Sequence, residues 1–367
     1  MAYDRPVVRG RHALLGLAVV AVLVAGVAMA QNAAKPKPRP GAVRFGVAAG
    51  GRLHDMSRRD LDRTLDGIRT AGAGWVRIDV NWAVIQRNGP GSYRWAPIDR
   101  VVRAARARGL RVLATILYTP RWAAAGTERG APPANLERYA AFAGKAAKRY
   151  AGFGVHTYEI WNEPNNAASW SPSPDPERYT KMLRLAYAAI KGVDRRATVI
   201  SAGLSPYGAR GQGDSRFMNP LDFLARMYAS GAHGSMDGVG WHPYTFPSGL
   251  GFAVSSAWSQ MAQTAPSARS IMAANGDGAK KIWVTEFGAP SGSTALNEAT
   301  QAALITAAYR MLTAARWAGP AFLYSYRDQG TVDPGAPADG GFGLVRSDWS
   351  KKPSFRAYQR LTKNATR

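Results

Sequence analysis

The sequence predicts an α/β protein with a (β/α)8, or TIM, barrel, and three observations lead to this prediction. Short apolar runs alternate with longer amphipathic runs from residue 43 to the C-terminal region, the pattern of parallel strands joined by crossover helices. Eight such pairs fill about 320 residues, which suits a barrel with enlarged loops. The longest connections follow strands, at the face where such barrels carry their sites.

The expected strands are apolar runs rich in branched and aromatic residues, at residues 43–48, 75–79, 111–117, 156–161, 198–202, 238–242, 282–286 and 321–326. The expected helices follow the helical period, at residues 57–70, 98–108, 135–150, 176–191, 221–229, 258–275, 296–317 and 354–361. Asp175 before Pro176 is a typical helix start, an N-cap followed by proline at the first helical position.

A doubly wound open sheet is the competing fold class for alternating strands and helices. Such sheets usually carry a glycine-rich phosphate-binding turn after the first strand. Gly50 and Gly51 follow the first strand here without that spacing. We therefore expect residues 43–367 to form one barrel domain.

The first 30 residues have the features of an export segment. Arg5, Arg9 and Arg11 precede the uncharged run 13–30, which ends in the small-residue pattern of a cleavage site. The run suits either a cleaved signal peptide, residues 1–30, or a membrane anchor. The Pro/Lys-rich segment 31–42 is expected to be a stiff spacer. In both cases the remainder is exported, either secreted or anchored to the outer face of the cytoplasmic membrane.

The composition limits the partners and cofactors. The formal charge is +24, yet the basic residues are spread along the chain without a run of five, so we expect no nucleic-acid partner. The chain has no cysteine, and its five histidines lack metal-ligand spacing. We expect a monomer that needs neither a metal nor an organic cofactor.

Two expected strands end in a glutamate. Glu163 lies between Asn162 and Pro164, just after the apolar run that ends in Trp161. Glu286 is the last residue of the run 282–286. The carboxyl ends of barrel strands meet at one face. Glycoside hydrolysis uses a pair of carboxylic acids, and these two glutamates would lie at that face.

Several segments carry a resemblance to a known group of proteins: Trp75-Val76-Arg77, Leu117-Tyr118-Thr119-Pro120-Arg121-Trp122, Trp161-Asn162-Glu163-Pro164, Trp241-His242-Pro243-Tyr244, Thr285-Glu286-Phe287-Gly288 and Phe342-Gly343-Leu344. With them, residues 43–361 resemble the clan A glycoside hydrolases, in particular bacterial proteins of family thirty-nine and the cellulase-like family five. Asn-Glu-Pro alone is a weak signal. Asn-Glu-Pro after the fourth strand together with Thr-Glu-Phe-Gly at the seventh is specific.

The resemblance implies a retaining mechanism in which Glu163 is the general acid/base and Glu286 the nucleophile. It also implies that Asn162 binds the sugar 2-hydroxyl, although a turn-forming asparagine is the plain alternative. His242 and Tyr244 look like the polar pair near the nucleophile, or equally like a satisfied loop.

The physics of the two roles agrees with this division. Donors such as Arg77 and Tyr244 would favour the ionised form of Glu286, while burial and repulsion would keep Glu163 protonated. Arg77 would alternatively pair with Asp79, which lies on the same face of the strand.

Aromatic side chains are candidates for the sugar platform, because sugars stack their apolar faces on rings. Of the 11 tryptophans, Trp122 is the best candidate for stacking. Many clan members carry a tryptophan at the end of the eighth strand, where this chain has Tyr324-Ser325-Tyr326. We expect Tyr326 to take its place.

The sequence thus predicts a retaining, preferentially endo-acting glycoside hydrolase for a β-linked poly- or oligosaccharide. A transglycosylase would use the same residues. A non-catalytic barrel that binds exopolysaccharide is the alternative from another class, but it would need neither glutamate.

Overall fold

The computed structural model of the protein describes residues 45–128, 130–206, 213–245, 256–292, 296–329 and 340–365. Its eight parallel strands close into a barrel in chain order, which confirms the predicted fold class. They are β1 (Phe45–Ala48), β2 (Trp75–Asn81), β3 (Arg111–Leu117), β4 (Thr157–Ile160), β5 (Thr198–Ser201), β6 (Gly238–Trp241), β7 (Lys281–Phe287) and β8 (Ala318–Tyr324). The expected signal or anchor segment 1–30 and the spacer 31–42 lie outside the described residues.

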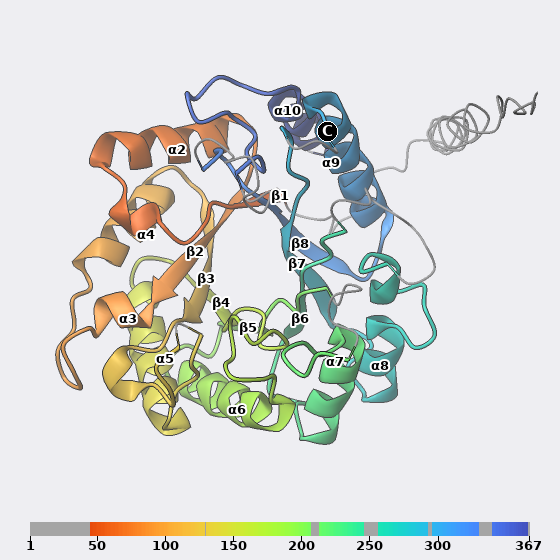
Figure 1. The fold of residues 1–367 in the computed structure, drawn as a ribbon. Coiled ribbons are helices and arrows are strands. Elements are labelled where there is room, and N and C mark those ends of the chain that lie inside the picture. The colour runs from red at the N-terminus through yellow and green to blue at the C-terminus, as the bar shows by residue number, and fades with distance from the viewer. Residues whose placement is uncertain are drawn as a thin grey trace, which may run out of the picture. The chain divides into compact units, whose positions relative to one another are not determined.

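The helices form the outer layer around the strands (Figure 1). They are α2 (Arg58–Thr70), α3 (Trp82–Ile85), α4 (Ala96–Ala107), α5 (Leu136–Ala151), α6 (Pro176–Val193), α7 (Pro220–Ala229), α8 (Ala268–Ala274), α9 (Glu298–Ala314) and α10 (Pro353–Ala365), with short 3-10 turns η1 (Leu53–Asp55), η2 (Arg121–Ala123) and η4 (Ser259–Met261). None of the helices in the described ranges is long and apolar enough to cross a membrane.

Short polar side chains fix where several helices begin. Ser57, Asn135, Asp175 and Asn297 each accept a hydrogen bond from a backbone N–H of the first turn, which satisfies a donor that the helix itself leaves unpaired. The start expected at Asp175 and Pro176 is among them.

One expected helix is wrong in extent. The helical pattern 258–275 contains Pro266, which cannot continue a hydrogen-bonded helix. Only η4 and α8 form there, and Ser267 caps α8 through a reciprocal pair of hydrogen bonds with Ser270.

The interior of the barrel is apolar at one level. Ala48, Trp75, Leu113, Ile200, Trp283 and Phe322 form a separate buried cluster. Glycines make room for its large rings, because a Cβ on Gly46 would overlap the Phe322 ring and one on Gly238 would lie 3.0 Å from Trp283. On β2, Arg77 and Asp79 follow Trp75 on the same face. The polar site therefore lies above an aromatic layer.

Candidate active site

The two glutamates predicted from the sequence come from the carboxyl ends of β4 and β7. Glu163 lies three residues after β4 ends, and Glu286 is the penultimate residue of β7. Their side chains keep 20% and 16% exposure, so both carboxylates are accessible from the open end of the barrel.

Arg77 connects β4 and the loop after it to β7 through hydrogen bonds. Its guanidinium donates to Glu286, to Glu159 at 2.6 Å and to the Asn162 side-chain oxygen at 2.8 Å. Burial alone would lower the pKa of Arg77, but the charges of Glu159 and Glu286 raise it. A permanent positive charge therefore lies beside Glu286. The expected alternative partner, Asp79, receives no hydrogen bond from Arg77.

Glu286 has a donor on each carboxylate oxygen. Arg77 binds one oxygen, and the Tyr244 hydroxyl donates to the other at 2.9 Å. Burial and the nearby charge of Glu286 hold the pKa of Tyr244 well above its usual value, so Tyr244 stays a donor. Two donors therefore fix the position of the Glu286 carboxylate.

Glu159 belongs to the site and was missed in the sequence. It is fully buried in β4 and accepts hydrogen bonds from Arg77, from the Thr115 hydroxyl at 2.8 Å and from the Gly203 N–H at 3.0 Å. A buried carboxylate needs such partners. An acidic residue inside an apolar run was the available signal, and Glu159 fixes the orientation of Arg77.

His242 connects Glu163 to the interior. Its Nδ1 lies 2.8 Å from a Glu163 oxygen and its Nε2 lies 2.9 Å from the Thr285 hydroxyl. Burial would lower the pKa of His242, but the charge of Glu286 and the hydrogen bond to Glu163 outweigh it and raise the pKa. Both ring nitrogens of His242 thus have a partner, and one of these partners is Glu163.

The backbone that presents Glu163 is strained. Trp161 has φ 75° and Glu163 has φ 46°, in the left-handed region that bulky residues seldom adopt. The buried Trp161 ring packs edge-on against Trp170, and its N–H donates to Ser169. This packing holds the strained turn, as is common at functional sites. Trp161 and Trp170 are thus anchors of the loop.

Gly203 lets these groups approach one another. Its carbonyl accepts the Glu163 N–H at 3.0 Å, and a Cβ on Gly203 would overlap His242 and contact Thr285. Only glycine therefore fits beneath the His242 ring.

The orientation of Asn162 follows from its partner. Arg77 has donors only, so the atom that faces it is the side-chain oxygen, at 2.8 Å. The amide NH₂ group is then left to donate elsewhere.

The position expected for Tyr326 is wrong. Strand β8 ends at Tyr324, and the chain turns before Tyr326, whose ring is buried with its hydroxyl against Gly67 of α2. Tyr324 instead reaches the site, where its ring lies 6.5 Å from Tyr244 and 5.4 Å from Phe342.

Trp122 lies in η2, after β3. It is half-buried, its N–H donates to the Gln86 carbonyl at 2.7 Å, and the Arg138 guanidinium lies 5.9 Å from its ring. Trp82 beside it is fully buried. These contacts fix the ring of Trp122, and its stacking on a sugar stays a prediction.

Arg327 and Asp328, which follow Tyr326 in the chain, each have a partner other than the neighbouring side chain. Arg327 lies over the Trp349 ring at 4.1 Å, while Asp328 forms an ion pair with the buried Lys352 at 2.8 Å. Both residues hold the loop after β8.

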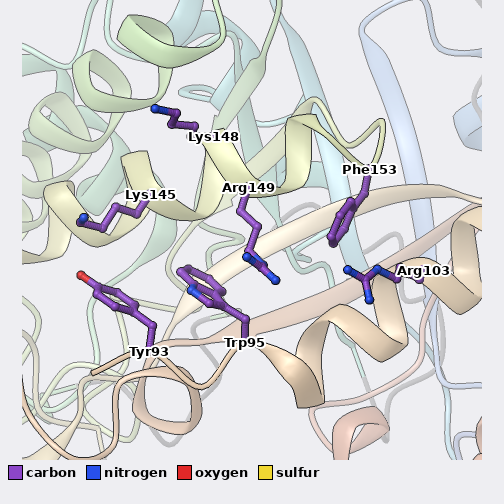
Figure 2. Close-up of a pocket in the computed structure, with 7 residues that line it drawn as sticks. All are labelled: Tyr93, Trp95, Arg103, Lys145, Lys148, Arg149 and Phe153. Atoms are coloured by element: carbon purple, nitrogen blue, oxygen red, sulfur yellow. The ribbon is translucent and has the colours of Figure 1, made fainter. Parts of the chain in front are cut away.

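A groove of about 470 Å³ lies in the outer layer of helices, away from the carboxylates (Figure 2). It is lined by residues of α4, α5 and the segments beside them: Tyr93, Trp95, Arg103, Lys145, Lys148, Arg149 and Phe153. Cations already lie over its rings, Lys145 over Tyr93 and Arg149 over Trp95. None of the predicted site residues lines it.

Within the described ranges, no group of three histidine, aspartate or glutamate side chains is arranged to hold a metal ion. A parallel barrel with two carboxylic acids at its strand ends defines the class of barrel glycoside hydrolases. Residues 44–319 match the family model described as Cellulase (glycosyl hydrolase family 5). The chain therefore belongs to this family, and the resemblance noted in its sequence is confirmed.

Solved structures show the same fold. A family 39 glycoside hydrolase from Bacteroides cellulosilyticus WH2 is 24% identical with a TM-score of 0.66, covering 88% of this chain and 64% of that one. A monomeric β-xylosidase from Caulobacter crescentus CB15 is 20% identical with a TM-score of 0.66, covering 89% and 69%. A GH5_18 enzyme from Streptomyces cattleya is 18% identical with a TM-score of 0.65, covering 89% and 81%.

A shorter likeness is to the chloroplastic β-amylase 1 of Arabidopsis thaliana. It is 28% identical over 61 residues, 17% of this chain and 11% of that protein. The chain thus spans less than two thirds of the length of this relative and of the Bacteroides structure.

Proposed function

We propose that the protein is a retaining glycoside hydrolase that cleaves β-glycosidic bonds, with Glu163 as acid/base and Glu286 as nucleophile. The supporting observation is the unequal surroundings of the two carboxylates. Glu286 has donors on both oxygens, from Arg77 and Tyr244, whereas within the described ranges the Glu163 carboxylate has one hydrogen-bond partner, His242. Environments that differ in this way divide acid from nucleophile.

The first step forms a covalent intermediate. Glu163 gives its proton to the glycosidic oxygen while a Glu286 oxygen attacks the anomeric carbon. The bond to the leaving sugar breaks, and that sugar departs as an alcohol. In the second step Glu163 takes a proton from water, the water oxygen attacks the same carbon, and Glu286 is released as a carboxylate.

Arg77, Tyr244 and His242 support these steps by position. Arg77 and Tyr244 hold Glu286 oriented and charged for attack. His242 fixes one oxygen of Glu163, so that the other oxygen faces the leaving group. The Asn162 amide donates to the sugar 2-hydroxyl, a contact that strengthens as the transition state forms.

Trapping the intermediate tests this assignment. A 2-deoxy-2-fluoro glycoside with an activated leaving group should label Glu286, as seen in the mass of its peptide, and proton NMR should show a first product with the β configuration. Glu177→Gln, an exposed glutamate on α6, is the matched control for Glu286→Gln. A first product of inverted configuration would contradict the retaining mechanism.

The substrate proposal is a β-linked poly- or oligosaccharide cleaved preferentially within the chain. The names of similar structures include a β-xylosidase and an exo-β-1,4-mannosidase, so β-xylan and β-mannan belong in the panel beside β-glucan. Chain-length analysis of early products distinguishes internal cleavage from release of terminal units. Products longer than the substrate would instead support a transglycosylase.

We also propose that the protein works outside the cytoplasm as a monomer, secreted or anchored through residues 13–30. The N-terminal sequence of the mature protein and its location after cell fractionation test this proposal. A protein that keeps Met1 and is found in the cytoplasm would contradict it.

A further inference from the structure

Asp79 is a third carboxylate at the open end of the barrel, and the mechanism above does not use it. It lies on β2 two residues beyond Arg77, on the same inward face. In the strand register it is paired with Thr115, which is paired with Glu159. Asp79 therefore belongs to the layer of polar side chains above the aromatic cluster that contains Trp75.

The Asp79 carboxylate has no donor within the part of the chain that the structure describes. The Arg77 guanidinium points to Glu159, Glu286 and Asn162. Burial raises the pKa of Asp79 to about 6; the charge of Arg77 opposes this and the charge of Glu286 adds to it. In the free protein the carboxylate is thus poorly compensated.

Asp79 is half-buried, and partial burial without a hydrogen bond makes its charged form costly in free energy. A titratable side chain kept under these conditions inside an active site is a candidate for function. The missing donors must then come from what binds there. Sugar hydroxyl groups are such donors, and their hydrogen bonds to a carboxylate are charge-assisted.

Gly51 leaves this carboxylate open. A Cβ at Gly51 would lie 2.8 Å from an Asp79 oxygen and 3.7 Å from the Tyr118 hydroxyl. Because glycine has no side chain, the loop after β1 passes close to Asp79 without covering it. Asp79 is accordingly only half-buried, and the charge of Glu286 acts on it.

We propose that Asp79 accepts hydrogen bonds from hydroxyl groups of the sugar bound beside Glu286, so that this site takes a neutral glycoside and rejects a uronide. A uronide would bring a further negative charge beside Asp79 and Glu286. This inference rests on the proposed function, and it makes Asp79 a residue that determines specificity.

The test measures binding separately from hydrolysis. Glu286→Gln in the full chain is titrated by calorimetry with cellotetraose, mannotetraose and xylotetraose, and with the β-1,4-linked glucuronate and mannuronate tetramers. The same titrations are made after adding Asp79→Asn. The control is Asp66→Asn, an aspartate on α2 whose side chain is 63% exposed.

We expect Asp79→Asn to weaken binding of the preferred neutral tetramer about 10- to 100-fold, the loss of a charge-assisted hydrogen bond. The preference for that tetramer over its uronate should fall by a similar factor, and Asp66→Asn should change neither. The Asp79→Asn chain should melt at the same or a higher temperature at pH 8, because it loses a half-buried charge that no described side chain compensates by a hydrogen bond. This readout separates lost binding from lost folding.

Two results would overturn the inference. One is binding of the neutral tetramer within about twofold of the parent after Asp79→Asn, with the preference over the uronate unchanged. The other is no binding of any neutral tetramer. If neutral tetramers bind through Asp79 but the wild-type chain hydrolyses none of them, the proposed function fails and this inference stands.

Discussion

Two arginine–carboxylate clusters in this protein have similar residues and different surroundings. In the active site, the side chain of Arg77 is 5% exposed. It binds the carboxylates of Glu159 and Glu286 and the side-chain amide of Asn162, and Glu286 lies at the mouth of the barrel. In the outer groove of Figure 2, the side chain of Arg149 is 34% exposed, and both of its hydrogen bonds go to one buried carboxylate, Asp99.

The difference lies in what each carboxylate faces. Both oxygens of Asp99 accept hydrogen bonds from Arg149. The Asp99 carboxylate is therefore directed at Arg149 and not at a ligand. Glu286 is bound as fully, yet it stays 16% exposed at the opening. A buried positive charge that supports an accessible carboxylate can serve chemistry, whereas a closed pair serves packing.

Replacing one carboxylate in each cluster by an amide should give the largest contrast. Glu286→Gln should lower kcat by about 10⁴-fold or more, because it removes a nucleophile. Asp99→Asn should leave kcat unchanged in the folded fraction. Steady-state rates on the substrate found in the panel, with circular dichroism for folding, check both. Equal losses of kcat in the two variants would contradict the distinction between the two clusters.

Removing the arginines should separate the clusters by stability. Arg77→Met leaves Glu159 buried without its cation and should cost about 3–5 kcal/mol of unfolding free energy. Arg149→Met leaves the buried Asp99 with Arg103 still 3.7 Å away, and should cost less, about 1–3 kcal/mol. Urea unfolding at pH 7 measures both. The ranking would be wrong if Arg149→Met cost as much as Arg77→Met.

Asp79 gives the active-site cluster a pH dependence. Its folded pKa is raised to about 6 from an ordinary 3.8, so the folded state holds the proton more tightly than the unfolded chain. Stability is therefore highest below pH 4 for this group and is lost as the pH rises through 6. Asp79→Asn should remove about 1–3 kcal/mol of that loss, measured as the difference between the two unfolding curves at pH 4 and pH 7.

The smallest effect is expected in the groove itself. Lys145→Ala removes an exposed cation from over Tyr93 and should change stability by about 0.5 kcal/mol or less. Catalytic rates should be unaffected. A rate loss in Lys145→Ala comparable to that of an active-site variant would connect the groove to substrate.

The sequence predicted the strands and both glutamates because they follow simple rules. Hydrophobic period locates a strand, and proline after Glu163 marks its end. The prediction for Tyr326 is wrong because β8 ends at Tyr324. The direction of the Tyr326 side chain depends on the turn after the strand, and a turn leaves no periodic pattern in the sequence. The helix expected over 258–275 is shorter in the structure because the apolar pattern runs through Pro266, which interrupts the helix.

The buried partners were harder to predict. Glu159 and Thr115 meet Arg77 through the register between strands, which is a relation among distant segments. The sequence placed Asp79 on the correct face of β2 and left Arg77 open as an alternative partner for it. The other carboxylates around Arg77 decide that pairing, and a single strand does not reveal them.

Gly203 limits how this site can be changed by engineering. Its carbonyl holds the Glu163 N–H, its N–H binds Glu159, and any side chain would displace His242. A mutant library that varies the loop after β5 to admit new sugars should therefore begin beyond residue 203. Substitutions of Gly203 itself would give variants in which Glu163 is no longer aligned.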